Sequence, residues 1–216
     1  MSVAKILSTK KLTQSQKELL LNANISFVEA NFIKPESLDF ECESIIDNGI
    51  ITSKNAVKSI LKKQIKINNC FCVGDKTEEI LIKNGYSIAE KGYQARTLAE
   101  KIIKAHSHKS FTFFCGDKRR EELPVLLKKY HIALNEIEVY KTELTTKQIE
   151  GYFDGILFFS PSAIQSYVLR NEFEDAIVFC IGRTTEAEAK KHTNNIITAN
   201  KATIENVIVQ VVKHFQ

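Results

Sequence analysis

The alternation of apolar and polar positions in residues 154–168, DGILFFSPSAIQSYV, predicts a short buried strand followed by a helix. The apolar run 156–159 is bounded by Gly155 and Ser160, which is typical of a strand in a parallel sheet. Ser160 is a good N-cap, and Pro161 suits the first helical position. Apolar side chains then recur on one face of the expected helix.

The same plan occurs a second time. Residues 47–60, DNGIITSKNAVKSI, lie 107 positions earlier and again place an apolar run before a serine and a helical pattern. CVGDKTEEIL, which begins at Cys72, is echoed 108 positions later by CIGRTTEAEA, which begins at Cys180. In both, a β-branched strand ends in glycine and a threonine opens a helix. This period is too long for a solenoid, so the repeat indicates a duplicated α/β domain.

Strands and helices alternate along the rest of the chain. Further strands are expected at 3–8, 70–73, 86–89, 111–115, 177–181 and 195–199, and helices at 12–23, 95–105, 119–130, 184–191 and from 204, where apolar residues form a helical stripe. Such alternation predicts parallel sheets with right-handed crossovers. The fold class is therefore α/β, with two similar doubly wound parallel-sheet lobes.

Two strands of exposed character, 25–33 and 137–144, are expected to pair as an antiparallel ladder between the lobes. Residues 1–32 and 145–216 would form a discontinuous first lobe and 36–138 the second, with 33–35 and 139–144 as the linker strands.

Composition is consistent with a globular cytoplasmic protein. Of the 216 residues, 44% are hydrophobic and 26% charged, which is ordinary for packed domains. The start of the chain is too short in its apolar part for a signal peptide, and no stretch approaches a membrane span. Most of the five cysteines lie in strand-like runs, as small buried hydrophobes do. A net charge of +4 does not by itself indicate nucleic acid.

Ligands of doubly wound sheets bind at the carboxyl ends of the strands, so the chemistry is expected in the strand-to-helix loops. These loops hold ten of the 30 lysines and arginines, as a site for an anionic ligand would. Helix N-termini opened by Ser53, Thr77, Ser160 and Thr185 would add backbone N–H donors. Ordinary loop polarity and ordinary helix caps would explain the same residues.

Common catalytic motifs are missing. There is no Walker sequence, no GxGxxG and no nucleophile elbow, and no histidine falls in the expected loops. His106 and His108 are more typical of a solvated helix end than of a metal site. Tyr140 lies on an expected linker strand, where it would either face a cleft or pack on a neighbouring strand.

Seven segments, in order and along essentially the whole chain, resemble the uroporphyrinogen-III synthase family: ITSKNAV, CVGDKTEEIL, FFCGDKRREELPVLLKKY, IEVYKTEL, ILFFSPSAIQSYV, CIGRTTEAEAKK and ATIENVI. The resemblance implies two HemD-type lobes joined by a two-stranded ladder. It also implies the reaction, in which hydroxymethylbilane loses its hydroxyl and cyclises with inversion of the last pyrrole to give uroporphyrinogen III. That chemistry depends on positioning a reactive polycarboxylate more than on a nucleophile.

The resemblance implies Tyr140, in the VYxT motif, as the catalytic acid. Substrate contacts are expected from the loop residues Thr9, Lys10, Ser53, Asn55, Gly74, Thr77, Gly116, Arg119, Arg120, Ser160, Ser162, Gly182, Arg183 and Thr185. Two positions depart from the family pattern. Lys10 stands where bacterial members often have arginine, and Ile51 stands where an aromatic residue commonly precedes Thr-Ser.

No cofactor and no metal are expected, and the partner would be an anionic tetrapyrrole substrate, without nucleic acid or membrane, bound by a monomer. A non-catalytic two-lobed protein that binds a small anionic ligand is the alternative, and an FMN binder is a third possibility. The absence of tryptophan and of a Ser/Thr-rich phosphate loop after the first strand disfavours the FMN binder.

Overall fold

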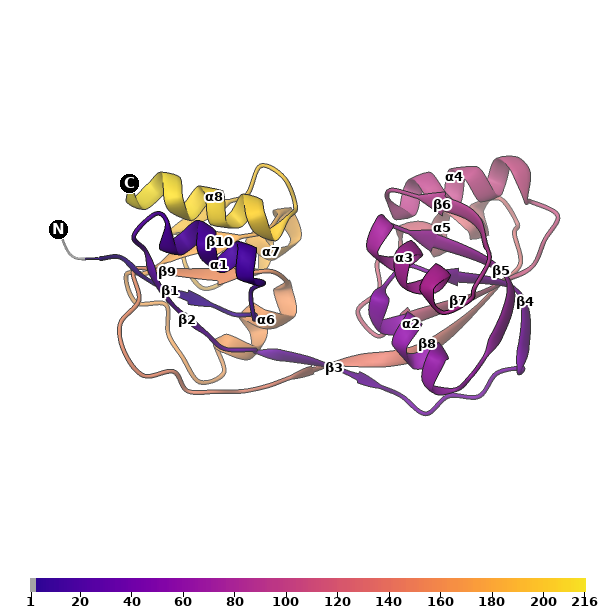
Figure 1. Cartoon of the computed structure of the whole chain (residues 1–216), viewed down its shortest axis with the longest axis horizontal. Coiled ribbons are helices and arrows are strands. Elements are labelled where there is room, and N and C mark those ends of the chain that lie inside the picture. Colours follow the sequence, from indigo (N-terminus) through magenta and orange to yellow (C-terminus); the bar gives the residue numbers. More distant parts are fainter. Residues whose placement is uncertain (1–2) are drawn as a thin grey trace. The chain divides into compact units, whose positions relative to one another are not determined.

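The computed structural model describes residues 3–216, and these residues form two compact units (Figure 1). Unit 1 contains the chain up to Lys34 and from Glu143 onward, and unit 2 is the continuous segment Pro35–Thr142. The predicted α/β fold with two similar lobes is confirmed. No helix in this part of the chain combines the length and apolar character needed to cross a membrane.

Unit 1 is built on a five-stranded sheet with the order β11-β10-β9-β1-β2. Each pair of neighbouring strands in it is parallel. Its elements are β1 (Lys5–Ser8), α1 (Gln14–Leu21), β2 (Ser26–Glu29), β9 (Gly155–Phe158), α6 (Pro161–Tyr167), β10 (Ile177–Cys180), α7 (Arg183–Ala189), β11 (Ile196–Thr198) and α8 (Ile204–Phe215).

Helices cover both faces of this sheet. Figure 1 shows α1 and α8 together across one face, where Leu20 and Val207 are buried against Ile6. On the other face α6 and α7 bury Ile164 and Ala189 against the opposite side of the strands. The apolar stripe of α8 predicted from the sequence is the surface that packs here. Burial on both faces explains why the strands are continuous apolar runs.

Unit 2 is built on a six-stranded sheet with the order β3-β8-β7-β4-β5-β6. Its helices α2 and α3 cover one face, and α4 and α5 the other. The elements are β3 (Ile33–Ser37), β4 (Ile45–Ile51), α2 (Lys54–Lys62), β5 (Lys66–Val73), α3 (Asp75–Lys83), β6 (Ile88–Gly92), α4 (Ala95–Ala105), β7 (Phe111–Gly116), α5 (Glu122–Lys129) and β8 (Leu134–Leu144).

The two units repeat one topology, but in a different order along the chain. The run from β9 to α8 in unit 1 corresponds to the run from β4 to α4 in unit 2, and β1-α1-β2 corresponds to β7-α5-β8. Unit 1 therefore begins with the strand pair that ends unit 2. The sequence repeat revealed only the shared run, because that run carries the two matched motifs.

The predicted strand at 25–33 was wrong. The structure has two strands there, because β2 ends at Glu29 and β3 begins at Ile33. Phe32, between them, is fully buried and packs edge-on against the Tyr167 ring at 5.3 Å. This buried aromatic turns the chain out of the sheet of unit 1, so the partner of β8 is β3 and not the segment 25–33.

The ladder that carries the chain between the units is antiparallel. Thr145 N donates to Phe32 O at 2.8 Å and Leu38 N donates to Val139 O at 3.0 Å, so one residue number rises as the other falls. Lys141 and Glu36 add an ion pair at 3.5 Å along it. On its other edge β8 runs parallel to β7.

Candidate active site

The strand-to-helix loops of unit 2 surround a hollow of about 340 Å³ at the carboxyl ends of its parallel strands. It is lined by Thr52, Ser53, Val73, Tyr93, Gln94, Ala95, Phe113, Arg120, Glu122, Leu123 and Tyr140. Three of the residues predicted from the sequence therefore meet in one place, namely Ser53, Arg120 and Tyr140. Ser53 follows β4, Arg120 follows β7 and Tyr140 lies on β8, and these segments are far apart in the chain.

Tyr140 is half-buried on β8 and shares a hydrogen bond with Ser53. The Ser53 hydroxyl donates to Tyr140 Oη at 3.2 Å, and Ser53 Oγ accepts from Ala56 N at 3.1 Å as the N-cap of α2. In this arrangement the serine both donates and accepts. The phenolic proton of Tyr140 is left to donate to a group in the hollow.

Gly116 allows the Tyr140 ring to lie where it does. The two residues are register partners on β7 and β8, next to a bulge between Cys115 and Gly116. A Cβ at position 116 would lie 2.6 Å from Cε2 and 2.8 Å from Oη of Tyr140, and closer still to Cζ. Glycine is needed here for close approach. Gly116 was predicted to contact substrate, and in the structure it lies beside the Tyr140 ring.

Asp117, which was not among the site residues predicted from the sequence, fixes the backbone of Tyr140. Its N–H donates to Tyr140 O at 3.2 Å, and its carboxylate accepts from Thr142 N at 2.9 Å. These bonds hold β8 at the tyrosine and just beyond it. An acidic residue directly after a strand that ends in glycine is the signal that would have found it.

The two arginines of the basic pair have different surroundings. Arg119 Nε donates to Glu136 at 2.6 Å, and its Nη1 lies 3.3 Å from Glu121, so its guanidinium is engaged by carboxylates of its own unit. The Glu136 hydrogen bond raises the pKa of Arg119 further. Arg120 is exposed and lines the hollow beside Tyr140. Of the two, Arg120 is therefore the one placed to receive an anionic ligand.

Comparison with known proteins identifies the fold and the family. A family model described as uroporphyrinogen-III synthase HemD matches residues 15–208. The chain belongs to this family. The crystal structure of uroporphyrinogen-III synthetase from Helicobacter pylori 26695 is similar with a TM-score of 0.77 and 16% identity, and the similarity covers 98% of this chain and 100% of that one.

A mutant uroporphyrinogen III synthase from the extremely thermophilic bacterium Thermus thermophilus is similar with a TM-score of 0.58 and 10% identity. That similarity covers 99% of this chain and 98% of the other. Identities this low show that the fold is shared, and the family match over most of the chain carries the assignment. No curated protein sequence matches significantly.

The predicted helix openings at Thr77 and Thr185 were wrong. The helices begin earlier, at Asp75 and Arg183, with Gly74 and Gly182 as their N-caps and without a side-chain cap bond. Both threonines lie inside the first turn and are buried, so their hydroxyls do not open the helices. Glycine at the cap position leaves the first N–H groups of each helix without a side-chain acceptor.

Ser160 and its neighbours occupy the carboxyl edge of the sheet of unit 1 in this synthase-family chain. Ser160 caps α6 by accepting from Ala163 N at 3.3 Å, with Pro161 in the first turn, as predicted. Ser162, two positions further, is buried. Arg183, the first residue of α7, is exposed.

The two predicted site residues that follow β1, Thr9 and Lys10, differ in their exposure to solvent. Thr9 is buried, and its hydroxyl donates to Leu157 O at 2.6 Å, which ties β1 to β9. Lys10 is exposed. In unit 2, Asn55 is half-buried in the first turn of α2, next to the Ser53 cap.

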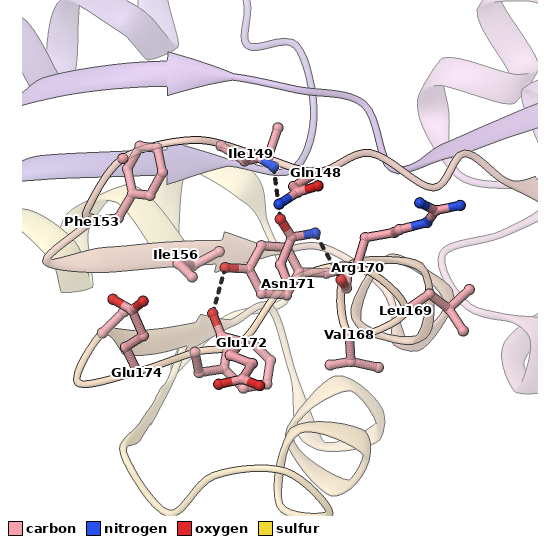
Figure 2. Close-up of a pocket in the computed structure, with 14 residues that line it drawn as sticks. Gln148, Ile149, Phe153, Ile156, Val168, Leu169, Arg170, Asn171, Glu172 and Glu174 are labelled. Carbon is pink, nitrogen blue, oxygen red and sulfur yellow. Dashed lines mark hydrogen bonds between the residues drawn. The ribbon is translucent and has the colours of Figure 1, made fainter.

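A second hollow, of about 450 Å³, lies at the opposite edge of the sheet of unit 1, before β9 and β10 begin. Figure 2 shows Asn171 at its centre, where the side-chain amide accepts from Ile149 N at 2.8 Å and donates to Tyr167 O at 2.9 Å. The Tyr167 hydroxyl donates to Glu172 O, and burial raises the pKa of this phenol to about 12. These polar groups thus bond to the protein's own backbone.

Two carboxylates, Glu172 and Glu174, and one cation, Arg170, also line this hollow, whereas one cation, Arg120, and one carboxylate, Glu122, line the hollow beside Tyr140. The second hollow would therefore repel a polycarboxylate ligand more strongly. The hollow beside Tyr140 is therefore the better candidate for the site of this enzyme family.

The remaining reactive side chains do not form a site. Burial raises the pKa of Cys70 to about 12 and that of Cys72 and Cys115 to about 11, so these thiols are poor nucleophiles at neutral pH. Among residues 3–216, the His, Cys, Asp and Glu side chains form no group of three that could hold a metal ion.

Proposed function

We propose that this chain converts hydroxymethylbilane to uroporphyrinogen III with loss of water and inversion of the terminal pyrrole. The family match over residues 15–208 carries this proposal, and the hollow around Tyr140 supplies the groups that the reaction needs. The enzyme is a cyclising lyase of haem and tetrapyrrole biosynthesis.

Tyr140 is the proposed acid. Its phenolic proton passes to the departing hydroxyl group, which leaves as water while electrons of the pyrrole nitrogen stabilise the positive charge on the carbon. The terminal pyrrole then attacks that carbon through the ring carbon that already carries its methylene bridge, the bond from this ring carbon to the bridge breaks, and the freed bridge carbon bonds to the unsubstituted α-carbon of the same ring, which inverts the ring. The proton lost from that α-carbon as the ring regains aromaticity returns to the tyrosinate. Ser53, which donates to the phenolic oxygen, stabilises the tyrosinate that forms after proton transfer.

Arg120 is the proposed anion-binding group of unit 2. It is exposed at the hollow, whereas Arg119 is engaged by Glu136. Thr9, Lys10, Asn55, Gly74, Thr77, Ser160, Ser162, Gly182, Arg183 and Thr185 remain proposed substrate-binding positions. For Thr9, Thr77 and Thr185, whose side chains are buried, we propose that backbone groups make the contact.

We further propose that the enzyme acts as a cytoplasmic monomer on this one polycarboxylate, without nucleic acid and without a cofactor. The purified protein is expected to be colourless. Incubation with EDTA is expected to leave its turnover unchanged, and activity lost in EDTA and restored by a metal ion would overturn this part of the proposal.

The decisive experiment supplies hydroxymethylbilane generated enzymatically and separates the uroporphyrin isomers after oxidation. The expected result is an excess of isomer III over the isomer I that forms without an enzyme. Tyr140→Phe should lower kcat by about 10²- to 10⁴-fold, the usual contribution of general acid assistance. Tyr130→Phe is the matched control, because Tyr130 is exposed at the far end of α5. Binding of substrate without isomer III would instead support a non-catalytic binding protein.

A further inference from the structure

Tyr93 is an aromatic residue left in solvent beside the candidate site. Its exposed fraction, 76%, is the highest of any large hydrophobic side chain in the described part of the chain. It follows β6 directly, in the connection to α4, and lines the hollow that contains Ser53, Arg120 and Tyr140. Most of this side chain faces water, although burial of an aromatic side chain is strongly favourable.

The connection that carries Tyr93 is held in a fixed position. At Gly92 a Cβ would lie 2.6 Å from Leu98 N, so the chain approaches α4 as closely as the backbone allows. Gly74 N donates to Gly92 O at 2.9 Å and ties the same point to the end of β5. The exposure of Tyr93 is therefore a consequence of how its backbone is fixed and not of a loose loop.

A lysine with its own partners lies over the Tyr93 ring. The Lys91 ammonium is 5.7 Å from the ring centroid, within the range of a cation–π contact. Lys91 is itself held by Asp75 at 3.1 Å and Glu78 at 2.6 Å. The two carboxylates fix the ammonium, and the ammonium restricts the ring.

The surroundings of Tyr93 suit a flat ring that carries carboxylates. Arg120 is exposed in the same hollow, and the N-terminus of α4 at Gln94 and Ala95 lines it without a side-chain cap bond. The volume of about 340 Å³ is at the small end of ligand pockets, which have roughly 300–1,000 Å³. This is space for one substituted pyrrole and not for a whole tetrapyrrole.

We propose that Tyr93 is a stacking surface for the pyrrole ring that bears the hydroxymethyl group, and that Arg120 and the α4 N-terminus bind the carboxylates of that ring. This inference rests on the proposed function, because that function supplies the pyrrole. The aromatic face of Tyr93 does the binding, and its hydroxyl is not needed. Tyr93 thus positions the reacting carbon beside the Tyr140 phenol.

The experiment compares Tyr93→Ala and Tyr93→Phe with the wild-type enzyme in steady-state turnover of hydroxymethylbilane, with the isomer ratio measured alongside. Tyr93→Ala should raise KM about three- to tenfold, the loss expected for one aromatic contact. It should also increase the fraction of isomer I, since substrate held less firmly closes without the enzyme. Tyr93→Phe should remain within about twofold of wild type, because it keeps the ring.

A second measurement uses a monopyrrole with one acetate and one propionate arm as the probe in equilibrium binding. Tyr93→Ala should weaken its binding, and Tyr130→Ala, which removes another exposed tyrosine outside the hollow, should not. Thermal melting of each variant checks that the fold is intact, as expected for changes at exposed side chains.

The proposal is overturned if Tyr93→Ala retains the wild-type KM and isomer ratio, or if Tyr93→Phe is as impaired as Tyr93→Ala. Failure of the proposed function gives a different result, because the wild-type protein itself would then produce no excess of isomer III.

Discussion

Replacement of Gly116 by alanine tests whether the position of the Tyr140 ring controls the rate. The added Cβ would lie 2.6 Å from Cε2 and 2.8 Å from Oη of the ring, and ordinary contacts begin near 3.4 Å. The ring must therefore move by roughly 1 Å, because carbon atoms repel steeply inside their contact distance. The β8 backbone cannot follow easily, since Asp117 binds it at Tyr140 and at Thr142.

The movement has two expected costs. Overpacking of this kind typically destabilises a protein by about 1–3 kcal/mol, which a thermal or urea melt of Gly116→Ala would measure. Displacement of the phenol from the Ser53 hydroxyl, now 3.2 Å away, should lower kcat by about 10²-fold, as expected for a misplacement of about 1 Å. KM should change little, because Arg120 is not touched by the substitution.

A double-mutant cycle separates this effect from general damage. In a Tyr140→Ala background there is no ring to displace, so Gly116→Ala should cost almost nothing further in kcat and less in stability. If Gly116→Ala alone stays within about twofold of the wild-type kcat, or if its cost is the same in both backgrounds, the close approach does not position the acid.

Three further predictions concern charge and thiols. Arg120→Ala should raise KM, and added salt should raise the KM of the wild-type enzyme toward the same value. Arg119→Ala should instead lower mainly the free energy of unfolding, by an ion-pair contribution of about 0–1 kcal/mol, which a thermal melt would measure. The opposite pattern would show that Arg119 binds the substrate. Lys101 donates to Glu90 at 2.8 Å and lowers the pKa of Glu90 from its usual value of 4.5. The stabilisation is therefore present above about pH 4.5 and lost as pH falls through the lowered pKa, so Glu90→Gln should flatten the pH dependence of unfolding in that acidic range. Cys42, the only thiol among the described residues that is not buried, should react first with a thiol reagent, and rapid modification of several thiols in the native state would contradict the structure.

The sequence was sufficient for the repeated units, because their signals are local. An apolar run that ends at a capped helix can be recognised without knowing its neighbours, and α4 was predicted with its observed ends at Ala95 and Ala105. The N-caps Ser53 and Ser160 were found for the same reason. Helix openings at Thr77 and Thr185 failed because hydroxyl residues are the preferred caps, while here a glycine three positions earlier takes that place.

The division between β2 and β3 could not be predicted, since it depends on the burial of Phe32 against Tyr167, which is distant in sequence. The candidate site was predicted only in outline, for a similar reason. Arg119 and Arg120 are indistinguishable in the sequence, and only the pairing of β7 with β8 brings Glu136 to Arg119. The strand before Tyr93 was expected to end at residue 89 and ends at Gly92 in the structure, so a small error in the end of a strand concealed Tyr93.

The permuted order of the two units has a consequence for how the chain folds as it is synthesised. Unit 2 is continuous in sequence, whereas β1 in unit 1 cannot pair with β9 until synthesis has passed Gly155. The hydrogen bond from Lys5 N to the Asp154 carboxylate, for example, spans 149 positions. Folding of unit 2 forms the β3-β8 ladder as far as Glu36 and Lys141. Its continuation joins Phe32 to Thr145 and shortens the loop that unit 1 must close to roughly a quarter. Two halvings of a loop lower its closure entropy cost by about 1.2 kcal/mol in total. The N-terminal part of unit 1 is thus synthesised first, but unit 1 is completed last. The folding of the inserted unit 2 brings the two parts of unit 1 close together in space.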